Sequence, residues 1–155
     1  MQTTQTLKQM PTVREFMTKI VITIETHKTI VEAAQLMSQK GVGDLIVMDG
    51  KKPIGIVTER DFVRRVVAER KTLDTKVSEI MTTPLRVINP DATLREAARK
   101  MVGRGIRRLA VIEKERLVGI ITATDLARHL CGKTLTEEIL EAIGHHYSVP
   151  EGFKE

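Results

Sequence analysis

The stretch Gly55-Ile56-Val57-Thr58-Glu59-Arg60-Asp61 decides how this chain folds, because it returns 64 residues later as Gly119-Ile120-Ile121-Thr122-Ala123-Thr124-Asp125. Each copy begins with a short apolar run, typical of a buried strand, and continues with Thr-x-x-Asp, typical of a helix start. A strand that leads into a helix start leaves free backbone N–H groups, which suit an anion such as phosphate. The Asp is placed to accept hydrogen bonds from a sugar diol. We therefore expect two such sites.

The repeat extends well beyond this stretch. Residues Val13–Arg64 align with Val77–Arg128 at the same offset and without a gap. About a third of the aligned positions are identical, which a random alignment would not give. The sequence therefore predicts two halves of one topology that pack about a pseudo-twofold axis.

Each half is predicted to contain a helical turn, a strand, a helix, two strands and a helix. Thr29-Ile30-Val31-Glu32 forms a capping box, Gly41 ends the helix that follows, and Asp49-Gly50 favours a hairpin turn. The second hairpin turn, Glu113–Glu115, has no glycine, so its backbone is expected to differ. The predicted segments are Val13–Met17, Val21–Ile24, Thr29–Lys40, Asp44–Met48, Pro53–Thr58 and Glu59–Ala68, then Val77–Met81, Arg86–Ile88, Thr93–Val102, Arg108–Ile112, Leu117–Thr122 and Ala123–Leu130.

Length and composition set limits on the class of protein. The 155 residues are 41% apolar but only 3% aromatic, so the core must be aliphatic. Cys131 is the single cysteine, which excludes an intrachain disulfide and fits a reducing, cytoplasmic compartment. No apolar run approaches the roughly 18 residues that a membrane span needs. We expect a soluble protein with a flexible segment at 1–12, repeats at 13–70 and 77–132, and a helix and tail at 134–155.

The repeated motifs carry a resemblance to a known family. The matching residues are Met17-Thr18, Gly41–Val47, Gly55–Asp61, Met81-Thr82, Gly105–Val111 and Gly119–Asp125. In this order the two halves closely resemble the cystathionine-β-synthase (CBS) domain, and two in tandem look like a CBS pair, or Bateman module. The implied fold class is α/β (α+β), with two tandem β-α-β-β-α repeats and an added C-terminal helix.

The resemblance also implies a function. CBS pairs are typically non-catalytic sensors that bind AMP, ADP, ATP or sometimes S-adenosylmethionine in two clefts. Each cleft takes its Thr and Asp from one repeat and its adenine-facing first strand from the other, and pairs commonly dimerise into a flat disc. Carried over by position, one cleft contains Thr122, Thr124 and Asp125, with Ile20 and Ile22 as the adenine wall and Val42 nearby. The other contains Thr58, Arg60, Asp61, Pro84, Arg86 and Ile106, and Arg107 and Arg108 lie where a phosphate is expected.

Two of these assignments have a purely structural alternative. Thr-x-x-Asp is close to a capping box, which stabilises a helix start by about 1 kcal/mol. The chain uses Glu in its other two boxes, at Glu32 and Glu96, so the choice of Asp favours a ligand role that is compatible with capping. Arg107 and Arg108, together with Arg104, also fit a solvated basic face. The two clefts are not equivalent, because Arg107-Arg108 replaces Gly43-Asp44 and Thr124 replaces Arg60.

These observations favour a regulatory module that binds an adenine nucleotide and acts through its conformation or an unidentified protein partner. The alternative is a nucleic-acid-binding protein that uses the basic surface, since the net charge is +5. The sequence has no recognition helix and few aromatics for stacking bases, so we do not expect nucleic acid as a partner. It also lacks a nucleophile–base pattern, and its histidines are too sparse for a metal site. We expect no enzyme activity, and a homodimer.

Overall fold

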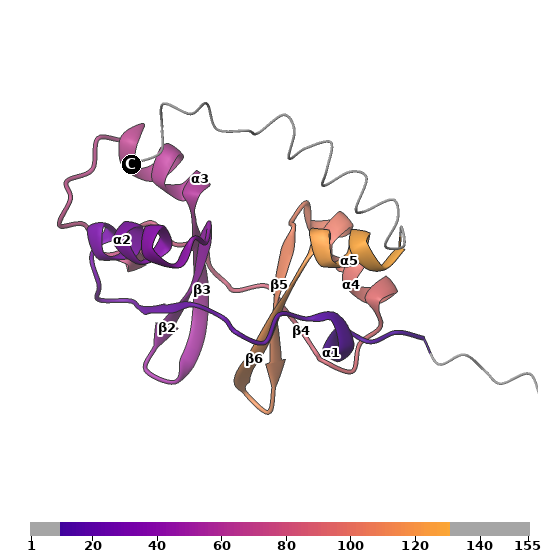
Figure 1. Cartoon of the computed structure of the whole chain (residues 1–155). Helices are drawn as coiled ribbons and strands as arrows, with labels where there is room; N and C mark the ends of the chain where they lie inside the picture. Colours follow the sequence, from indigo (N-terminus) through magenta and orange to yellow (C-terminus); the bar gives the residue numbers. More distant parts are fainter. Residues whose placement is uncertain (1–9, 131–155) are drawn as a thin grey trace, which may run out of the picture.

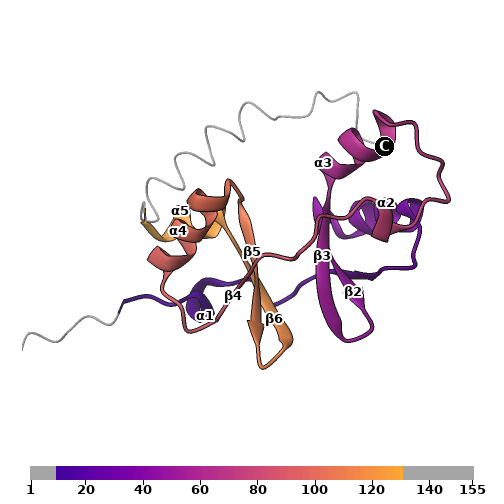
Figure 2. The same ribbon diagram turned by 180° about the vertical axis from the view of Figure 1, so that it is seen from behind.

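The computed structural model describes residues 10–130, which form two lobes of the same construction. In each lobe a three-stranded sheet faces the other lobe and helices lie on the outer side (Figures 1 and 2). The strands are β1 (Thr23–Glu25), β2 (Asp44–Asp49) and β3 (Lys52–Thr58), then β4 (Val87–Ile88), β5 (Arg108–Glu113) and β6 (Arg116–Thr122). The helical segments are α1 (Val13–Phe16), α2 (Ile30–Lys40), α3 (Glu59–Asp61), η1 (Phe62–Val67), η2 (Val77–Glu79), α4 (Leu94–Arg104) and α5 (Ala123–Leu130). The mixed α+β class and the repeated topology are confirmed.

The two sheets have the same strand order and register, although β1 forms one more residue pair with β2 than β4 forms with β5. In each, the first strand is parallel to the second, and the second is antiparallel to the third. Asp44 pairs with Thr58 in the first sheet, and Arg108 pairs with Thr122 in the second. An irregularity follows Val47 in one sheet and the equivalent residue in the other. Residues that are 64 positions apart in the sequence therefore occupy equivalent places in the two sheets.

The long helices α2 and α4 start and end as the sequence predicts. The Glu32 carboxylate accepts from the Thr29 backbone N–H at 2.8 Å, and the Thr29 hydroxyl accepts from the Glu32 N–H at 3.2 Å. Thr93 and Glu96 repeat this box in α4. Gly41 ends α2 in the left-handed conformation, with φ of 63°, which glycine adopts without a Cβ penalty.

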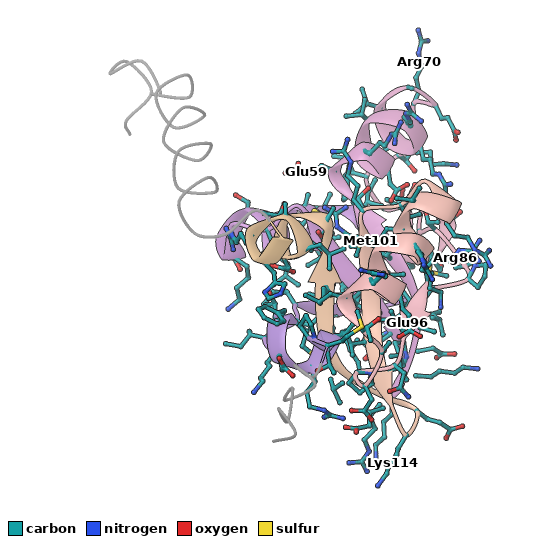
Figure 3. All side chains as sticks on the ribbon, turned by 90° about the vertical axis from the view of Figure 1, so that its right-hand side faces the viewer. Glu59, Arg70, Arg86, Glu96, Met101 and Lys114 are labelled. Atoms are coloured by element: carbon teal, nitrogen blue, oxygen red, sulfur yellow. The ribbon has the colours of Figure 1, made fainter. Side chains whose placement is uncertain are left out.

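Several predicted boundaries are wrong by small amounts. Strand β1 starts at Thr23, and α3 is one α-helical turn that continues as the π-helix η1. The hairpin turn between β5 and β6, whose tip carries Lys114 (Figure 3), does differ from the first one. Lys114 and Glu115 both have positive φ there, whereas the first turn has a single positive φ at Gly50.

Each hydrophobic core is completed by a segment from the other half of the sequence. Val77 and Ile80 are fully buried in the core of the first lobe, and Val13 is fully buried in the core of the second. Figure 1 shows α1 beside the β4-β5-β6 sheet, away from α2. The Val13 N–H donates to the Ala92 carbonyl, and the Val77 N–H to the Lys28 carbonyl, each at 2.8 Å. The two repeats therefore exchange their first helical turns.

A third apolar cluster lies between the two sheets. All its members except Leu117 come in pairs that are equivalent in the repeat, such as Ile46 with Ala110 and Ile56 with Ile120. Equivalent residues that pack together must lie close to the axis that relates the two halves. The predicted pseudo-twofold arrangement is confirmed, and the cluster lies at its centre.

Two expectations concern parts of the chain outside residues 10–130. The predicted C-terminal helix and tail, 134–155, and Cys131 lie outside the described residues, as do residues 1–9 of the N-terminal segment. Between residues 10 and 130, none of the helices combines the length and the apolar character that crossing a membrane requires.

Candidate functional site

The repeated Thr-x-x-Asp motif connects the last strand of each sheet to the following helix. Asp61, only 8% exposed, accepts through Oδ2 from the Thr58 backbone N–H at 2.9 Å and from the Thr58 hydroxyl at 3.2 Å. Asp125 accepts from the same groups of Thr122 at 2.8 and 2.9 Å, and its own N–H donates to the Thr122 hydroxyl at 3.2 Å. The capping arrangement that the sequence left open is therefore present in both copies.

The two aspartates differ in the use of their second oxygen. Oδ1 of Asp61 lies 3.6 Å from Nε of Arg65, which also donates to the carbonyls of Ile80 and Met81. The residue equivalent to Arg65 is His129, whose ring lies 4.2 Å from that of Phe16, measured between centroids. Among residues 10–130, no cation pairs with Asp125. Within these residues, Oδ1 of Asp125 therefore lacks the cation partner that Oδ1 of Asp61 has.

The segments predicted to face adenine cross from one sheet to the other. Thr18 and Ile120 exchange two backbone hydrogen bonds of 2.8 and 2.9 Å, and the Ile22 carbonyl accepts from Ile46 at 3.2 Å. Residues 18–22 therefore connect β6 of the second half to β2 of the first. Ile20, in the middle of this crossing, is 81% exposed, which is unusual for a large apolar side chain.

The second crossing repeats the first at the equivalent positions. Thr82 and Ile56 exchange hydrogen bonds of 2.8 and 3.1 Å, and the Arg86 carbonyl accepts from Ala110 at 3.0 Å. Pro84 and Arg86 therefore lie on a segment that connects β3 to β5, and both are exposed (Arg86 is labelled in Figure 3). Each Thr-Asp motif therefore follows a strand, β3 or β6, that is hydrogen-bonded to a segment of the other repeat.

The remaining predicted residues fall into two groups. Val42 and Ile106 are half-buried, and each packs against the core of its own lobe. Arg60, Arg107 and Thr124 are exposed. The exposed group is available to a ligand, whereas the first two also have a structural role.

One charged pair joins the two motifs. Nε of Arg108 lies 3.0 Å from Oδ2 of Asp44, and the two residues are equivalent in the repeat. Because Asp44 pairs with Thr58 and Arg108 with Thr122, this ion pair lies between the two strand ends. Arg108, expected near phosphate, is therefore engaged with a carboxylate across the axis.

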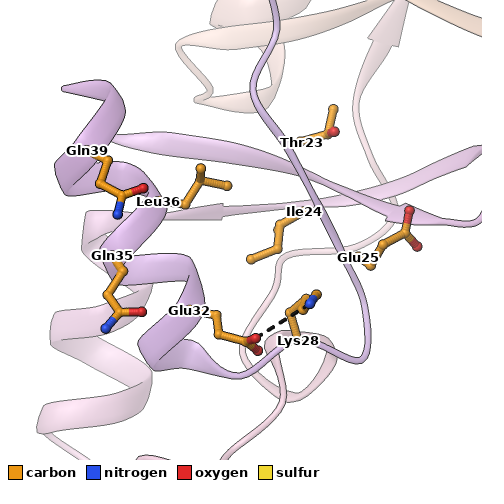
Figure 4. Close-up of a pocket in the computed structure, with 8 residues that line it drawn as sticks. All are labelled: Thr23, Ile24, Glu25, Lys28, Glu32, Gln35, Leu36 and Gln39. Carbon is orange, nitrogen blue, oxygen red and sulfur yellow. Dashed lines mark ion pairs between the residues drawn. The ribbon is translucent and has the colours of Figure 1, made fainter.

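The structure also shows two hollows in the first lobe. One, of about 370 Å³, lies between β1 and α2 and contains none of the predicted residues (Figure 4). Lys28 and Glu32 form an ion pair of 3.5 Å in it, and the Thr29 N–H lowers the pKa of Glu32. In the second lobe the equivalent of Leu36 in this hollow is Lys100, which donates to the Val87 carbonyl.

The other hollow, of about 550 Å³, lies where α2 ends and α3 begins. Val42 lines it together with Gly43, Glu59 and Phe62. Glu59 was not among the predicted site residues, although its replacement by Ala123 in the second copy of the motif is visible in the sequence. Across residues 10–130, no three His, Cys, Asp or Glu side chains converge as metal ligands would.

A family comparison settles what this duplicated architecture is. The model of the CBS domain matches residues 13–68 and again residues 77–132, which together are most of the chain. The chain belongs to the CBS domain family. The resemblance noted from the motifs is thereby confirmed, and the two matched CBS domains are the two sequence repeats.

Several known chains and solved structures are similar to this chain. The CBS domain-containing protein YhcV of Bacillus subtilis is 36% identical over 136 residues, which are 88% of this chain and 97% of that protein. The Methanopyrus kandleri protein MK0525 is 38% identical, but this chain spans only 56% of its length. The CBS domain pair of MJ0100, in complex with 5′-methylthioadenosine and S-adenosylmethionine, has a TM-score of 0.72 and 28% identity, and covers 81% of this chain and 99% of its own. CBSX2 in complex with AMP has a TM-score of 0.67 and 25% identity, and covers 78% and 96%.

Proposed function

We propose that this CBS pair is a non-catalytic regulatory module that binds an adenosine compound of the AMP, ADP or ATP type, with S-adenosylmethionine as a further candidate. The observation that carries the proposal is the crossing of residues 18–22 and 82–86 between the sheets. Through these crossings, each Thr-Asp motif shares a strand with an exposed segment of the other repeat. A ligand at either motif therefore contacts both halves of the molecule.

The groups present match the parts of such a ligand. Oδ1 of Asp125 has no cation partner among residues 10–130 and can accept from a ribose hydroxyl, and a charge-assisted hydrogen bond of this kind is stronger than a neutral one. The exposed side chain of Ile20 offers an apolar surface for adenine, and Ile22 and Val42 are the further apolar residues that we assign to this cleft. Thr122, Thr124 and the guanidinium groups of Arg107 and Arg108 supply donors for phosphate. The second cleft is formed in the same way by Thr58, Arg60, Asp61, Pro84, Arg86 and Ile106.

Regulation follows from the position of the clefts. A ligand changes a protein's conformation only if it binds one arrangement more tightly than another. Here the variable arrangement is the angle between the two sheets, since residues of both contribute to each cleft. A protein partner that contacts both lobes would detect this angle, and we place the module in the cytoplasm with such a partner.

Calorimetric titration with AMP, ADP, ATP and S-adenosylmethionine tests the proposal. We expect at least one of the four to bind. Asp125→Ala should abolish binding at the cleft that contains Thr122, and Asp61→Ala should abolish binding at the other cleft. Asp49→Ala, at the exposed end of β2, is the matched control and should leave binding unchanged. Unaltered titrations for both motif variants would contradict the residue assignment.

The helix after β3 supports the proposal of a homodimer. Val63 and Val67, one helical turn apart, are 64% and 72% exposed. We expect Val63→Glu with Val67→Glu to convert the dimer to a monomer, because a buried carboxylate without a partner is costly. Light scattering after size-exclusion chromatography would measure the mass, and Leu73→Glu, similarly exposed but between the two repeats, is the control. A monomeric wild-type chain would contradict the proposal.

A further inference from the structure

We propose that the two clefts take different ligand classes, and that Glu59 and Asp44 make the Thr58 end reject phosphate. The Thr58 end is defined here by Thr58–Asp61, and the Thr122 end by Thr122–Asp125. On this proposal a phosphate-bearing nucleotide binds at the Thr122 end, and the Thr58 end accepts an uncharged or cationic adenosyl compound. The inference rests on the proposed function and deepens it by assigning a ligand class to each cleft.

The first observation is the position of the Glu59 carboxylate. Glu59 is the first residue of α3 (Figure 3), and its N–H donates to the Gly43 carbonyl at 3.0 Å. The side chain then lies over Gly43, so that a Cβ built on this glycine would be 3.3 Å from the Glu59 Cδ and Oε2 atoms. The carboxylate therefore occupies the space beside the start of β2.

The same backbone contact carries opposite side chains at the other end. The Ala123 N–H donates to the Arg107 carbonyl at 2.8 Å, as Glu59 does to Gly43. The Thr58 end has the glycine Gly43 and the carboxylate of Glu59 at this contact. The Thr122 end has the guanidinium of Arg107 and the methyl group of Ala123 at the equivalent positions. One geometry thus presents an acidic group at one end and a basic group at the other.

The second observation is the ion pair on the axis. Asp44 pairs in register with Thr58, and Arg108 with Thr122, so each charge lies beside the threonine of its own end. A phosphate at the Thr122 end meets Arg107 and can draw Arg108 from its 3.0 Å contact with Asp44. A phosphate at the Thr58 end meets Asp44 and Glu59 instead, and like charges at such short range repel.

The other charges near the Thr58 end do not cancel this difference. Arg65 is already engaged by Asp61 and by the carbonyls of Ile80 and Met81. Arg60 is exposed, as are Glu59 and Arg107, so solvent screens all three charges alike and the difference in sign between the two ends remains. With Asp44, Glu59, Arg60 and the Asp61–Arg65 pair, the Thr58 end carries one net negative charge, whereas Arg107, Arg108 and Asp125 give the Thr122 end one net positive charge.

Titration of the intact chain with AMP, adenosine and S-adenosylmethionine tests this inference. We expect one AMP per chain in the wild type and an AMP affinity at the Thr58 end weaker by about tenfold or more. Asp125→Ala should abolish the AMP site, whereas Asp61→Ala should retain it. Adenosine, which has no phosphate, should bind at both ends.

A double variant makes the test specific to charge. Asp44→Asn with Glu59→Ala should create a second AMP site without altering adenosine binding, and the reverse change, Ala123→Glu, should weaken AMP at the Thr122 end. Glu69→Ala, an exposed carboxylate further along the chain, is the matched control. Two equal AMP sites in the wild type would overturn this inference alone. An absence of binding by all three compounds would overturn the proposed function, and this inference with it.

Discussion

A fragment of residues 10–69 is expected to show no cooperative thermal unfolding, although it contains a complete copy of the sequence repeat. The core of the first lobe needs Val77 and Ile80, which are fully buried in it and lie beyond the end of this fragment. Burial of a Val or Ile side chain contributes about 1.5–3 kcal/mol, so the two together contribute a large share of a small domain's stability. Circular dichroism during heating would measure the transition.

The matched control is a fragment of residues 18–84, which is slightly longer. It loses Val13, whose partners lie in the second lobe, but keeps the exchanged turn η2 and the hydrogen bond from Val77 to Lys28. Both fragments lack the second sheet, so both expose the first-lobe members of the apolar cluster between the sheets. We expect the 18–84 fragment to unfold cooperatively, and a transition of equal sharpness in the 10–69 fragment would contradict the exchanged-core arrangement.

Gly119→Val is expected to destabilise the full chain by about 3 kcal/mol, within the range for overpacked cores. A Cβ at Gly119 would lie 2.6 Å from the Met17 sulfur and 2.9 Å from the Thr18 carbonyl oxygen. The sulfur is flexible, but the carbonyl is fixed by the two hydrogen bonds between Thr18 and Ile120. The strand therefore has to shift, and the crossing segment with it. Chemical denaturation would measure the change.

The chain offers a glycine for comparison. Gly103 lies in α4, and a Cβ there would have no neighbour within 4 Å. Gly103→Ala should raise the free energy of unfolding by about 0.5–1 kcal/mol, because alanine loses less entropy in a helix. If both variants changed stability equally, the close approach at Gly119 would not be the cause.

Local sequence patterns were sufficient to predict most of the elements. Thr29 with Glu32, and Gly41, define the ends of α2, and alternation and turn residues define the paired strands. The constant offset of the repeat also gave the pseudo-twofold axis. What these patterns could not show is which core a given apolar turn joins. Val13 is apolar whether it packs on its own repeat or on the other, so the exchange became visible only in the structure.

The candidate site was predictable to a similar degree. The Thr-Asp motifs were found from the repeat and the adenine-facing segments from the family resemblance, whereas the crossing of these segments between the sheets was not predicted. The capping contacts of Asp61 and Asp125 were an open alternative that the structure shows to be present. The pairing of Arg108 with Asp44 was not predicted, because the two residues are far apart in sequence and meet only at the axis. Glu59 was missed because its orientation over Gly43 depends on the loop geometry.

The exchange of α1 and η2 has a consequence for the ancestry of the chain. A gene that encoded a single repeat would have given a polypeptide whose own first turn could not complete its own core. Two copies of that polypeptide, each packing its first helical turn into the core of the other, would have completed both cores. Duplication and fusion of such a gene would join the two copies in one chain and allow equivalent positions, such as Asp44 and Arg108, to acquire opposite charges.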